Sequence, residues 1–458
     1  MKKTIALAEN RLAAALVPAE EQPYQVPENW CWVRFGVLAT EMADGPFGSN
    51  LKSEHYTTNK EVRIIQLSNI GDKGWKEDNT KYTTFEHAET IARSLVQPGN
   101  IVIAKMMPAG RAIICPSGEA QYVLSSDAVK VVPYKEIPNR FMCFSINSPY
   151  FRNLIQENTQ GITRARTSIK KLKTYPFALP PLPEQCRIVD LITSLFAQLD
   201  EAQEEAQAVI DGYENRKDSI LHNAFTGELT SQLAQQRDAE WMTVYLKEVV
   251  AGFKYGTSEK SDYSNSGIPV LRIPNIGEGN IDFSDIKFLE GDTDAGYYVH
   301  EHDVLIIRSN GSRDLVGKCA IVPATEQQYV YASFLIKIIP SEKVLADYLV
   351  LFLNSSDARA QLFAKAKSSA GIHNINSKEL GAIQMPLPEI WEQKEIVKRA
   401  DALLRQEDDV KAAAEQTLEQ IDALRQSILA RAFRGELGTN DPDDEPAIEL
   451  LKRTLDAQ

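Results

Sequence analysis

The feature that most constrains the fold is an internal duplication. The segment Ser219–Leu229 returns as Ser427–Leu437, 208 residues later, and both copies end in Ala-Phe-x-Gly-Glu-Leu. Upstream, Ile65–Gly71 returns as Leu271–Gly277 at an offset of 206. Blocks that keep their order at a nearly constant offset indicate one unit present twice, because the repeats of a solenoid are far shorter.

Each unit begins with a globular part of mixed secondary structure. Short apolar runs such as Ile101–Ala104 and Val304–Ile307 are punctuated by Gly, Pro, Asn and Asp, which is typical of strands joined by turns. A helix is expected near the end of each part, at 139–156 and 343–367. The pattern predicts an α+β domain of about 150 residues, which is an ordinary domain size.

Each unit ends in one long predicted helix. Apolar residues recur there at alternating spacings of three and four, and a 3.5-residue period held over about four heptads predicts a coiled coil. Gly227 and Gly435 follow the last heptads, where helices commonly end. The predicted seam comprises Ile188, Ile192, Leu195, Leu199, Val209, Ile396, Leu403, Val410, Ile421 and Ile428.

The two helices can bury these seams by pairing with each other. With a globular domain before each helix, an antiparallel pair gives a molecule with an approximate twofold axis. The alternative is that each helix pairs with a helix of another subunit. The predicted fold class is α+β, with two similar domains separated by two long helices that form an antiparallel coiled coil, pseudo-twofold symmetric.

The net charge of −13 is unevenly distributed along the chain. Counted by segment, it is −8 over 184–240 and −7 over 389–458, but +5 over 24–183 and −3 over 241–388. An acidic total argues weakly against a protein that coats nucleic acid, but here the acid is concentrated in the helical segments and the tail. A nucleic-acid partner for the globular parts is therefore compatible with the charge.

Cysteine spacing and hydropathy indicate the compartment. The five cysteines are far apart and form no CxxC pair, so neither a zinc site nor a disulfide framework is indicated. No run of 18 apolar residues occurs, and the apolar run at the N-terminus is too short for a signal peptide. We therefore expect a cytoplasmic protein without a membrane partner.

The order of the motifs carries a family likeness. A variable domain precedes Pro-Leu-Pro-Glu-Gln, a long heptad helix and Ala-Phe-x-Gly-Glu-Leu, and the whole order is repeated. The first copy is Pro181–Gln185 with Ala224–Leu229, and the second is Pro386–Glu389 with Ala432–Leu437. Nearly the whole chain resembles the specificity subunit of type I restriction–modification systems. One departure is that three residues separate Glu389 from Gln in the second copy, which is expected to shift the start of the second helix.

This resemblance implies that each globular part is a target-recognition domain that reads one half of a split, asymmetric DNA site, and that the helices set the spacing. The implied partners are double-stranded DNA, two DNA-methyltransferase (modification) subunits and restriction/translocase subunits. The expected division is an N-terminal segment at 1–23, target-recognition domain 1 at 24–183, a central coiled-coil helix at 184–229, target-recognition domain 2 at 230–388, a distal coiled-coil helix at 389–437 and an acidic C-terminal tail at 438–458.

The sequence contains no recognisable catalytic motif. It lacks the Asn/Asp-Pro-Pro-Tyr/Phe tetrapeptide that adenine methyltransferases need, a glycine-rich methyl-donor loop and a P-loop for ATP. His300-Glu301-His302 has no further ligand nearby in sequence, so a metal site is not favoured. We expect a non-catalytic chain without a metal or cofactor of its own; the resemblance implies S-adenosylmethionine, ATP and Mg in partner subunits.

Four pairs of matched loops are candidates for DNA contact, which needs cations for phosphates and polar groups for base edges. In the first pair, at 45–52 and 252–260, glycines allow close backbone approach and lysines supply charge. The alternative is a surface turn with scattered lysines. The candidates are Phe47, Ser49 and Lys52, and in the second unit Lys254, Tyr255, Thr257 and Lys260.

The second pair of loops follows a predicted strand in each unit. Gln66 and Asn69 in the first unit match Arg272 and Asn275 in the second. Amide and guanidinium groups can make bidentate contacts to adenine and guanine. For the two asparagines, the alternative is that they cap a turn.

The third pair leaves a strand of four apolar residues and places two cations around a glycine. Its candidates are Lys105 and Arg111 in the first unit and Arg308, Asn310 and Arg313 in the second. A rigid strand end that holds a polar loop is a suitable place for residues that read bases.

The fourth pair, at 161–167 and 371–376, is basic in the first unit and rich in amides in the second. Its candidates are Arg164 and Arg166, and His373 and Asn374. The alternative is a solvated charge run.

The leading interpretation is a non-catalytic DNA-specificity subunit. One alternative is a coiled-coil scaffold or adaptor without direct DNA readout, and another is a specificity module that serves a nuclease-methylase of another layout. In the tail, Asp441–Pro446 is expected to be solvated and followed by a short amphipathic helix. The N-terminal segment is expected to pack with this tail.

Overall fold

The computed structural model divides the chain into two compact units. The first comprises Met1–Glu205 with Thr417–Gln458, and the second comprises Ala206–Gln416. We call the globular part of each unit its head, residues 31–179 in the first unit and 242–387 in the second. The structure describes residues 2–106, 109–119, 121–159, 166–236, 240–264, 266–365, 367–369 and 372–457.

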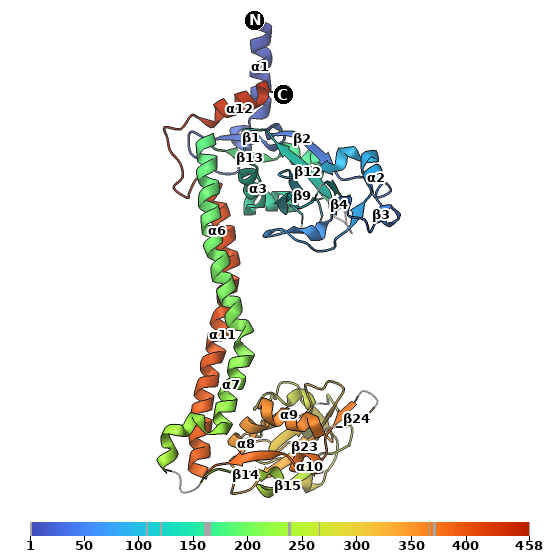
Figure 1. Ribbon diagram of the computed structural model, residues 1–458, viewed down its shortest axis with the longest axis vertical. Helices are drawn as coiled ribbons and strands as arrows, with labels where there is room; N and C mark the ends of the chain where they lie inside the picture. The colour runs from blue at the N-terminus through green and yellow to red at the C-terminus, as the bar shows by residue number, and fades with distance from the viewer. Residues whose placement is uncertain are drawn as a thin grey trace. The chain divides into compact units, whose positions relative to one another are not determined.

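Two sheets form most of the head of the first unit (Figure 1). One has four antiparallel strands, in the order β10 (Ala112–Ile114), β9 (Ile101–Ala104), β12 (Ala128–Pro133) and β2 (Ala39–Asp44). The other has the order β3 (Tyr56–Thr57), β7 (Tyr82–Thr83), β4 (Val62–Ile65), β11 (Tyr122–Leu124) and β8 (Leu95–Val96). Strands β4 and β11 run parallel, which requires the long connection between them.

Smaller elements complete this head. Two further strand pairs are antiparallel, β1 (Cys31–Arg34) with β13 (Pro176–Leu179) and β5 (Ile70–Gly71) with β6 (Gly74–Trp75). Because β1 and β13 are the first and last strands, their pairing closes the head. The helices are α2 (Phe85–Thr90), α3 (Asn139–Asn147), α4 (Pro149–Glu157) and α5 (Ile169–Thr174).

The head of the second unit repeats this topology. Its antiparallel four-stranded sheet has the order β21 (Cys319–Ile321), β19 (Val304–Ile307), β23 (Leu335–Pro340) and β15 (Val250–Tyr255), and β14 (Met242–Tyr245) pairs with β26 (Gln384–Leu387). The remaining elements are β16 (Ser261–Asp262), β17 (Ile268–Leu271), β18 (Lys287–Leu289), β20 (Ser309–Asn310), β22 (Val330–Tyr331), β24 (Lys367–Ser369), β25 (Ile372–Asn374), α8 (Ala346–Leu353), α9 (Ser356–Lys365) and α10 (Ser377–Gly381).

One strand in each head separates two hydrophobic cores. All four residues of β9 are buried, and Ile101 and Ile103 join one core while Val102 and Ala104 join the other. Strand β19 divides its residues between two cores in the same way. Alternate side chains of a strand point to opposite faces, so a strand covered on both faces must be a continuous apolar run. The predicted α+β class with long helices is confirmed.

The long helices are α6 (Leu182–Asp211), α7 (Tyr213–Thr226) and α11 (Ile390–Ala432). The single central helix predicted from the sequence is thus assigned in two parts that meet at Gly212. Helical hydrogen bonds continue across this point, since the amide of Gly212 donates to Ala208 (3.0 Å) and that of Arg216 to Gly212 (3.1 Å). Helix α7 ends at Gly227, whose φ of 83° is the left-handed conformation that glycine adopts at helix ends.

The helices pair antiparallel within each unit. In the first unit, the guanidinium of Arg425 on α11 contacts Asp200 on α6 at 2.6 Å. In the second, the guanidinium of Arg216 on α7 contacts Glu407 on α11 at 2.7 Å. The guanidinium of Arg399, nearer the start of α11, donates to the carbonyl of Leu229, which follows α7. Residue numbers rise along one helix as they fall along the other. The predicted twofold relation of the two units stays a prediction.

Part of the predicted seam is wrong. Ile188, Ile192, Ile396 and Ile421 are buried, and Leu195, Leu199, Val209 and Ile428 are half-buried. Leu403 and Val410, however, are 37% and 47% exposed. Leu404, which follows Leu403, packs against the core of the second unit instead. Elsewhere along α11, long cationic side chains cover apolar surface with their stems. Lys411 lies 4.4 Å from the Tyr213 ring, and the buried Arg425 lies 5.0 Å from the Phe196 ring.

A buried glutamate joins each head to its helices. Glu184, at the start of α6, accepts hydrogen bonds from Trp30 Nε1 (2.7 Å), Thr439 Oγ1 (3.2 Å) and Asn440 Nδ2 (2.8 Å). In the second unit, Glu392 accepts from Trp241 Nε1 (2.8 Å) and Thr230 Oγ1 (2.7 Å). In both units the carboxylate therefore binds the segment before the first strand and the segment after the opposite helix.

The hydrogen bonds of these glutamates and of the glutamines that follow them show which residues of the two copies are equivalent. The Gln185 side chain donates to Pro180 O and the Gln393 side chain to Pro388 O, each at 2.9 Å. Glu184 therefore corresponds to Glu392, not to Glu389. Helix α6 begins at Leu182 within its Pro-Leu-Pro-Glu motif, whereas α11 begins at Ile390, three residues after Leu387 of the second motif, so the expected shift of the second helix start is confirmed.

Both chain ends pack on the first unit. Helix α1 (Lys2–Ala15) lies against α12 (Ala447–Asp456), whose apolar face is buried in the core of the head (Figure 1). The amphipathic helix and its packing with the N-terminal segment are therefore as predicted. The preceding acidic segment is not fully solvated, because Asp444 is 11% exposed and pairs with Arg187 at 2.5 Å.

Among the helices of the described ranges, none joins enough length to enough apolar character to span a bilayer.

The glutamate contact generates a prediction about stability. Replacing Glu184 with leucine leaves the buried donors of Trp30 and Thr439 and the half-buried amide of Asn440 without their acceptor, and each loss of a buried partner costs about 1–3 kcal/mol. We expect the free energy of opening of the first unit to fall by about 3 kcal/mol or more, measured by hydrogen exchange of the β1 amides. The control Glu201→Leu changes an exposed position of the same helix and should have no effect. Unchanged exchange in Glu184→Leu would contradict the role assigned to this contact.

Candidate nucleic-acid interface

The structure brings the third and fourth predicted loops together in both heads. In the second head, β20 pairs with β25, so that Asn310 lies opposite His373, and the amide of Ile375 donates to Arg308 O at 2.8 Å. In the first head, the amide of Thr167 donates to Lys105 O at 3.2 Å. In each head, residues that are far apart in sequence therefore form a polar surface at the end of one strand, β9 in the first head and β19 in the second.

The first head presents cations beside this junction. Lys105 pairs with Asp44 at 2.7 Å, and Arg166 pairs with Asp127 at 2.5 Å. Arg164 lies outside the described residues. Arg111 is mostly buried, and its guanidinium is 4.0 Å from the Asp72 carboxylate. A carboxylate can hold a cation in place until a phosphate competes for it.

The first loop of this head is exposed. The side chains of Phe47, Ser49 and Lys52 all reach solvent, and Phe47 is 82% exposed. A cavity of about 430 Å³ lies between this loop, α2 and the residues Lys105 and Arg166. Three of the four predicted loops of the first head therefore contribute to one concave surface.

The second head holds its arginines against neighbouring groups. Arg272 donates to the carbonyl of Asp285 at 3.0 Å and pairs with the carboxylate of the same residue at 3.0 Å. Arg308 lies 4.8 Å from the Tyr255 ring, and the exposed Arg313 lies 4.7 Å from the Phe363 ring. Stacking on an aromatic ring orients a guanidinium and leaves its edge available for hydrogen bonds.

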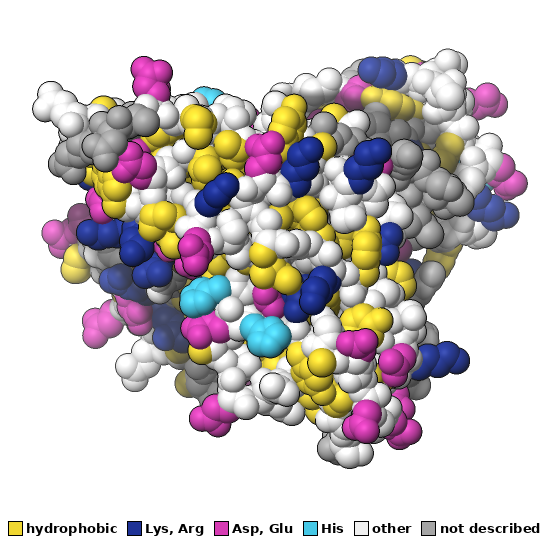
Figure 2. Space-filling view, turned by 90° about the horizontal axis from the view of Figure 1, so that it is seen from below, with side chains coloured by type: hydrophobic (Ala, Val, Ile, Leu, Met, Phe, Trp, Pro, Cys, Tyr) yellow, Lys and Arg dark blue, Asp and Glu magenta, His cyan; other side chains and the backbone are white. Residues whose placement is uncertain are grey.

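The first loop of the second head carries exposed lysines. Lys254 and Lys260 are exposed, and no ion pair to either is found within the described ranges. Tyr255 is 39% exposed, and its hydroxyl accepts a hydrogen bond from the amide of Ser377 at 3.0 Å. Figure 2 shows acidic and basic side chains intermingled on the face that it presents, so contacts to a polyanion must come from local groups.

Three predicted contact residues are structural instead. Asn69 and Asn275 are buried, and each accepts the amide of the residue three positions earlier and donates to two carbonyls. Every hydrogen-bonding group of these side chains is therefore used within a turn, as the alternative interpretation held. Thr257 is 3% exposed and accepts the amide of Glu259. Asn310 also accepts a local amide, that of Ser312, at 2.7 Å.

Several buried polar atoms on these loops bond to no other described residue. On the second loop they are Gln66 Oε1 and Arg272 Nε, which stand at matched positions, and on the other loops they are Arg111 Nε, Arg308 Nε and Asn374 Oδ1. Buried polar groups are normally hydrogen-bonded, and an unpaired one is costly. A ligand that supplies hydrogen-bonding groups could satisfy these loop atoms, but unpaired buried atoms also occur elsewhere, on Arg63 and Thr193 for example, so they do not by themselves mark a site.

Sequence reasoning missed two exposed residues at this surface. Arg93, which follows α2, lines the cavity beside Lys105, and Phe334 of the second head is 56% exposed and lines a cavity beside Arg272. Arg93 was missed because the loops were chosen by matching the two copies, and α2 has no counterpart in the described part of the second copy. For Phe334, the one signal in the sequence is an aromatic residue directly before a strand.

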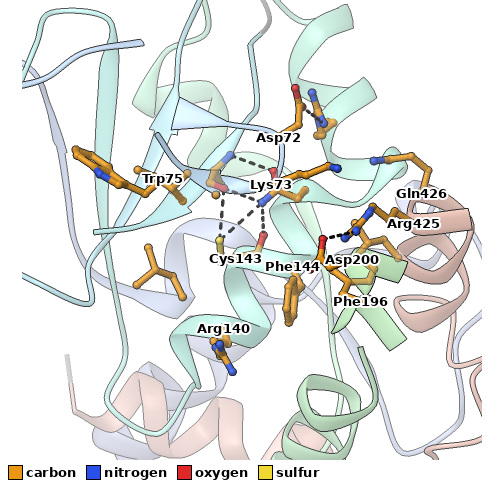
Figure 3. A pocket seen from close by; sticks show the side chains of 17 residues that line it. Asp72, Lys73, Trp75, Arg140, Cys143, Phe144, Phe196, Asp200, Arg425 and Gln426 are labelled. Carbon is orange, nitrogen blue, oxygen red and sulfur yellow. Dashed lines mark hydrogen bonds and ion pairs between the residues drawn. The ribbon is translucent and has the colours of Figure 1, made fainter. Parts of the chain in front are cut away.

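A second cavity of the first unit lies where the head meets its helices, and it holds none of the predicted contact residues. Its volume is about 340 Å³, and Asp200 and Arg425 pair at its edge beside Phe196 (Figure 3). Cys143 on α3 faces it, and burial raises the pKa of this thiol to about 12. Such a thiol is protonated at neutral pH and a poor nucleophile.

The described ranges hold no group of three or more His, Cys, Asp or Glu side chains placed to bind a metal ion. In the second unit, a cavity of about 510 Å³ occupies the equivalent place. There, the hydrogen bond from Lys217 lowers the pKa of the Glu278 carboxyl. Each of the two cavities thus contains an internal ion pair, Arg425 with Asp200 in the first unit and Lys217 with Glu278 in the second.

Comparison with known proteins agrees with this architecture. The family described as type I restriction modification DNA specificity domain matches residues 51–210 and 238–420. The EcoKI specificity subunit of Escherichia coli (strain K12) is 26% identical over 422 residues, which are 90% of each chain. The StySPI specificity subunit of Salmonella potsdam is 23% identical over 423 residues, again 90% of each chain.

A solved structure shares the fold. The crystal structure of the HsdS subunit from Thermoanaerobacter tengcongensis superimposes with a TM-score of 0.62 at 20% identity, and the match covers 91% of this chain and 100% of that one. The family match takes in most of the chain, in two segments that correspond to the two copies of the repeated unit. The chain therefore belongs to the family of type I restriction–modification DNA specificity domains.

Proposed function

We propose that this chain is the non-catalytic DNA-specificity subunit of a type I restriction–modification complex, and that each head reads one half of a split, asymmetric DNA site. The observation that carries this proposal is the junction of two loops at the same strand end in both heads. The scaffold is repeated, but the side chains on it differ. Lys105 and Arg166 stand in the first head where Arg308, His373 and Asn374 stand in the second.

The repeated scaffold with different loops supports two different half-sites. Cations of the first head suit phosphates and guanine, whereas the amide and guanidinium groups of the second suit adenine and guanine edges. Because the chain is acidic overall and many cations are paired with carboxylates, we expect it to bind DNA weakly alone. Partner subunits would supply much of the phosphate contact.

The remaining roles follow from the family resemblance. Helices α6, α7 and α11 would set the spacing between half-sites and dock two methyltransferase subunits, and restriction/translocase subunits would join that core. The mapping of S-adenosylmethionine, ATP and Mg to those partners is part of the same proposal. The exposed apolar residues Leu403, Val410 and Leu424 on α11 support a further contact along this helix, because they do not face its intramolecular partner.

Two other functions remain to be separated from this one. A coiled-coil scaffold without DNA readout would explain the helices but not the exposed lysines and unpaired polar atoms of the loops. A module that serves a nuclease-methylase of another layout would read DNA in the same way but would assemble with a different partner. Retention of the chain with its methyltransferase partner on random duplexes separates the first alternative, because a scaffold would retain none.

The direct test of the proposal is to map methylated adenines in host DNA. We expect a split motif with two different halves and a fixed gap, and we expect its methylation to be lost when the gene for this chain is deleted. A continuous motif, or a split motif that survives the deletion, would contradict the proposal.

A second prediction concerns the exposed lysines of the second head. Lys254→Ala and Lys260→Ala should each lower the slope of log binding constant against log salt by about one unit, because each removes one phosphate contact. The matched control is Lys343→Ala, an exposed lysine of the same head outside the four loops. Filter binding of the assembled methyltransferase at several salt concentrations measures the slope. An equal change in the control would mean that the effect is not local.

A third prediction concerns base readout in the second head. Arg272→Lys keeps the charge but removes the bidentate fork, so we expect relaxed preference at one base pair of the half-site read by this head, with a cost of about 1–3 kcal/mol for the preferred base. The other half-site should be unchanged. Competition with duplexes randomised in one half at a time distinguishes these results. Relaxation in both halves would contradict separate readout.

A further inference from the structure

Phe47 is the most exposed large apolar side chain in the described part of the chain, at 82%. It lies in the turn Gly45-Pro46-Phe47-Gly48, directly after β2, on the surface assigned above to the first half-site. Single exposed apolar residues are common, so exposure alone indicates nothing. The support of this turn and the charges around it distinguish Phe47.

The turn is held firmly in place. The amide of Gly45 donates to Ala128 O at 3.0 Å, and the amide of Asn50 donates to Phe47 O at 2.7 Å. A side chain at Gly45 would bring its Cβ within 1.7 Å of the carbonyl oxygen of Ser125, so this close approach requires glycine. Phe47 is therefore presented from a braced turn and does not sit on a loosely attached loop.

Cations line the cavity to which the exposed ring belongs. They are Arg93, Lys105 and Arg166, of which Lys105 pairs with Asp44 and Arg166 with Asp127, and Asp44 is the single carboxylate among the described lining residues. A ligand that stacks on an aromatic side chain and pairs with the nearby cations has flat apolar faces and a negatively charged backbone. Stacked base pairs between two phosphate chains have this combination.

The first loop of the second head holds its aromatic residue differently. Tyr255 is the last residue of β15, as Asp44 is of β2, and it lies 4.8 Å from the Arg308 guanidinium while its hydroxyl accepts the amide of Ser377. Its side chain is engaged within the head and is 39% exposed. Among the first loops of the two heads, the free aromatic side chain is therefore that of the first head, whereas the exposed Phe334 of the second head precedes β23 and lies outside its first loop.

We propose that Phe47 inserts between two neighbouring base pairs of the half-site read by the first head. Insertion of an apolar side chain at a base step partly unstacks the step and kinks the duplex, by roughly 20–90° in known cases. The first half-site is then selected in part by how easily one step opens, in addition to contacts with base edges. This inference rests on the proposed function, because it requires that the first head bind DNA.

The test uses the full chain assembled with its methyltransferase subunits. The probe is a duplex carrying the split motif mapped in host DNA, with 2-aminopurine placed in turn at each step of the first half-site. Binding should raise the fluorescence at one step. Phe47→Ala should abolish this rise and weaken binding about tenfold, as expected for loss of one stacking contact. Phe47→Leu keeps an apolar wedge and should retain part of the rise.

The matched control is Phe85→Ala. Phe85 is a 48% exposed phenylalanine of the same head, at the start of α2, and it does not line the cavity beside Phe47. It should leave both fluorescence and affinity unchanged. Energy transfer between dyes at the duplex ends should report a kink in the unaltered complex that is reduced in Phe47→Ala.

The outcomes separate this inference from the proposed function. If the unaltered complex binds the motif but no step brightens, or if Phe47→Ala keeps the rise, the wedge is overturned and the proposed function stands. If Phe47→Ala prevents assembly with the methyltransferase, Phe47 is a protein contact, and the inference is also overturned. If the complex retains no duplex specifically, the proposed function fails and the inference fails with it.

Discussion

The buried carboxylate at the start of each long helix is the contact on which the rest of the molecule depends. Glu184 in the first unit and Glu392 in the second each bind a tryptophan that precedes the first strand of the head and a threonine that follows the opposite helix. A buried charge is tolerated only when hydrogen bonds compensate its lost hydration, so these donors cannot be removed one at a time without cost. Through this contact each head is joined to both helices of its unit.

The contact also explains why each structural unit contains a segment from the other copy of the sequence repeat. Thr439, which binds Glu184, comes after α11, and Thr230, which binds Glu392, comes after α7. Each unit is thus completed by a segment from the other copy of the sequence repeat. The C-terminal segment and α12 are part of the first unit for this reason, and they are not an independent acidic tail.

Charge is arranged so that recognition depends on a few side chains. The acid is concentrated along the helices and at the C-terminus, while the heads are slightly basic and slightly acidic. On the loops, Lys105, Arg166 and Arg272 are paired with carboxylates. Such pairs keep cations oriented, and a phosphate or base must displace a carboxylate to use them. The cost of this displacement lowers the affinity for DNA of any sequence, so binding depends on the additional contacts that the correct site makes.

Much of the fold could be predicted from the sequence because it follows local rules. The duplication, the apolar runs of β9 and β19 and the glycine at the end of α7 all depend on neighbours in sequence. The predicted helix seam is wrong at Leu403 and Val410 because a heptad count considers apolar residues alone. On the same helix, the cationic side chains of Lys411 and Arg425 pack against aromatic rings of the partner helices.

The candidate site was predictable only in part. Loops chosen by matching the two copies do converge, since a shared scaffold places them alike. Asn69 and Asn275 were misassigned because an amide in a turn and an amide that reads a base look the same in sequence, and only the bonds to two carbonyls distinguish them. Arg93 escaped because it has no counterpart in the second copy, and the convergence that makes it relevant arises from long-range folding.

The most direct measurement of separate readout places an iron chelate on one head at a time. Ser49→Cys and Ser312→Cys each put a thiol on an exposed loop, in a chain whose exposed Cys186 is replaced by serine. With the complex bound to the mapped motif, cleavage from Ser49→Cys should fall in one half of the site and cleavage from Ser312→Cys in the other. Cleavage of the same half by both, or of neither half, would contradict the account.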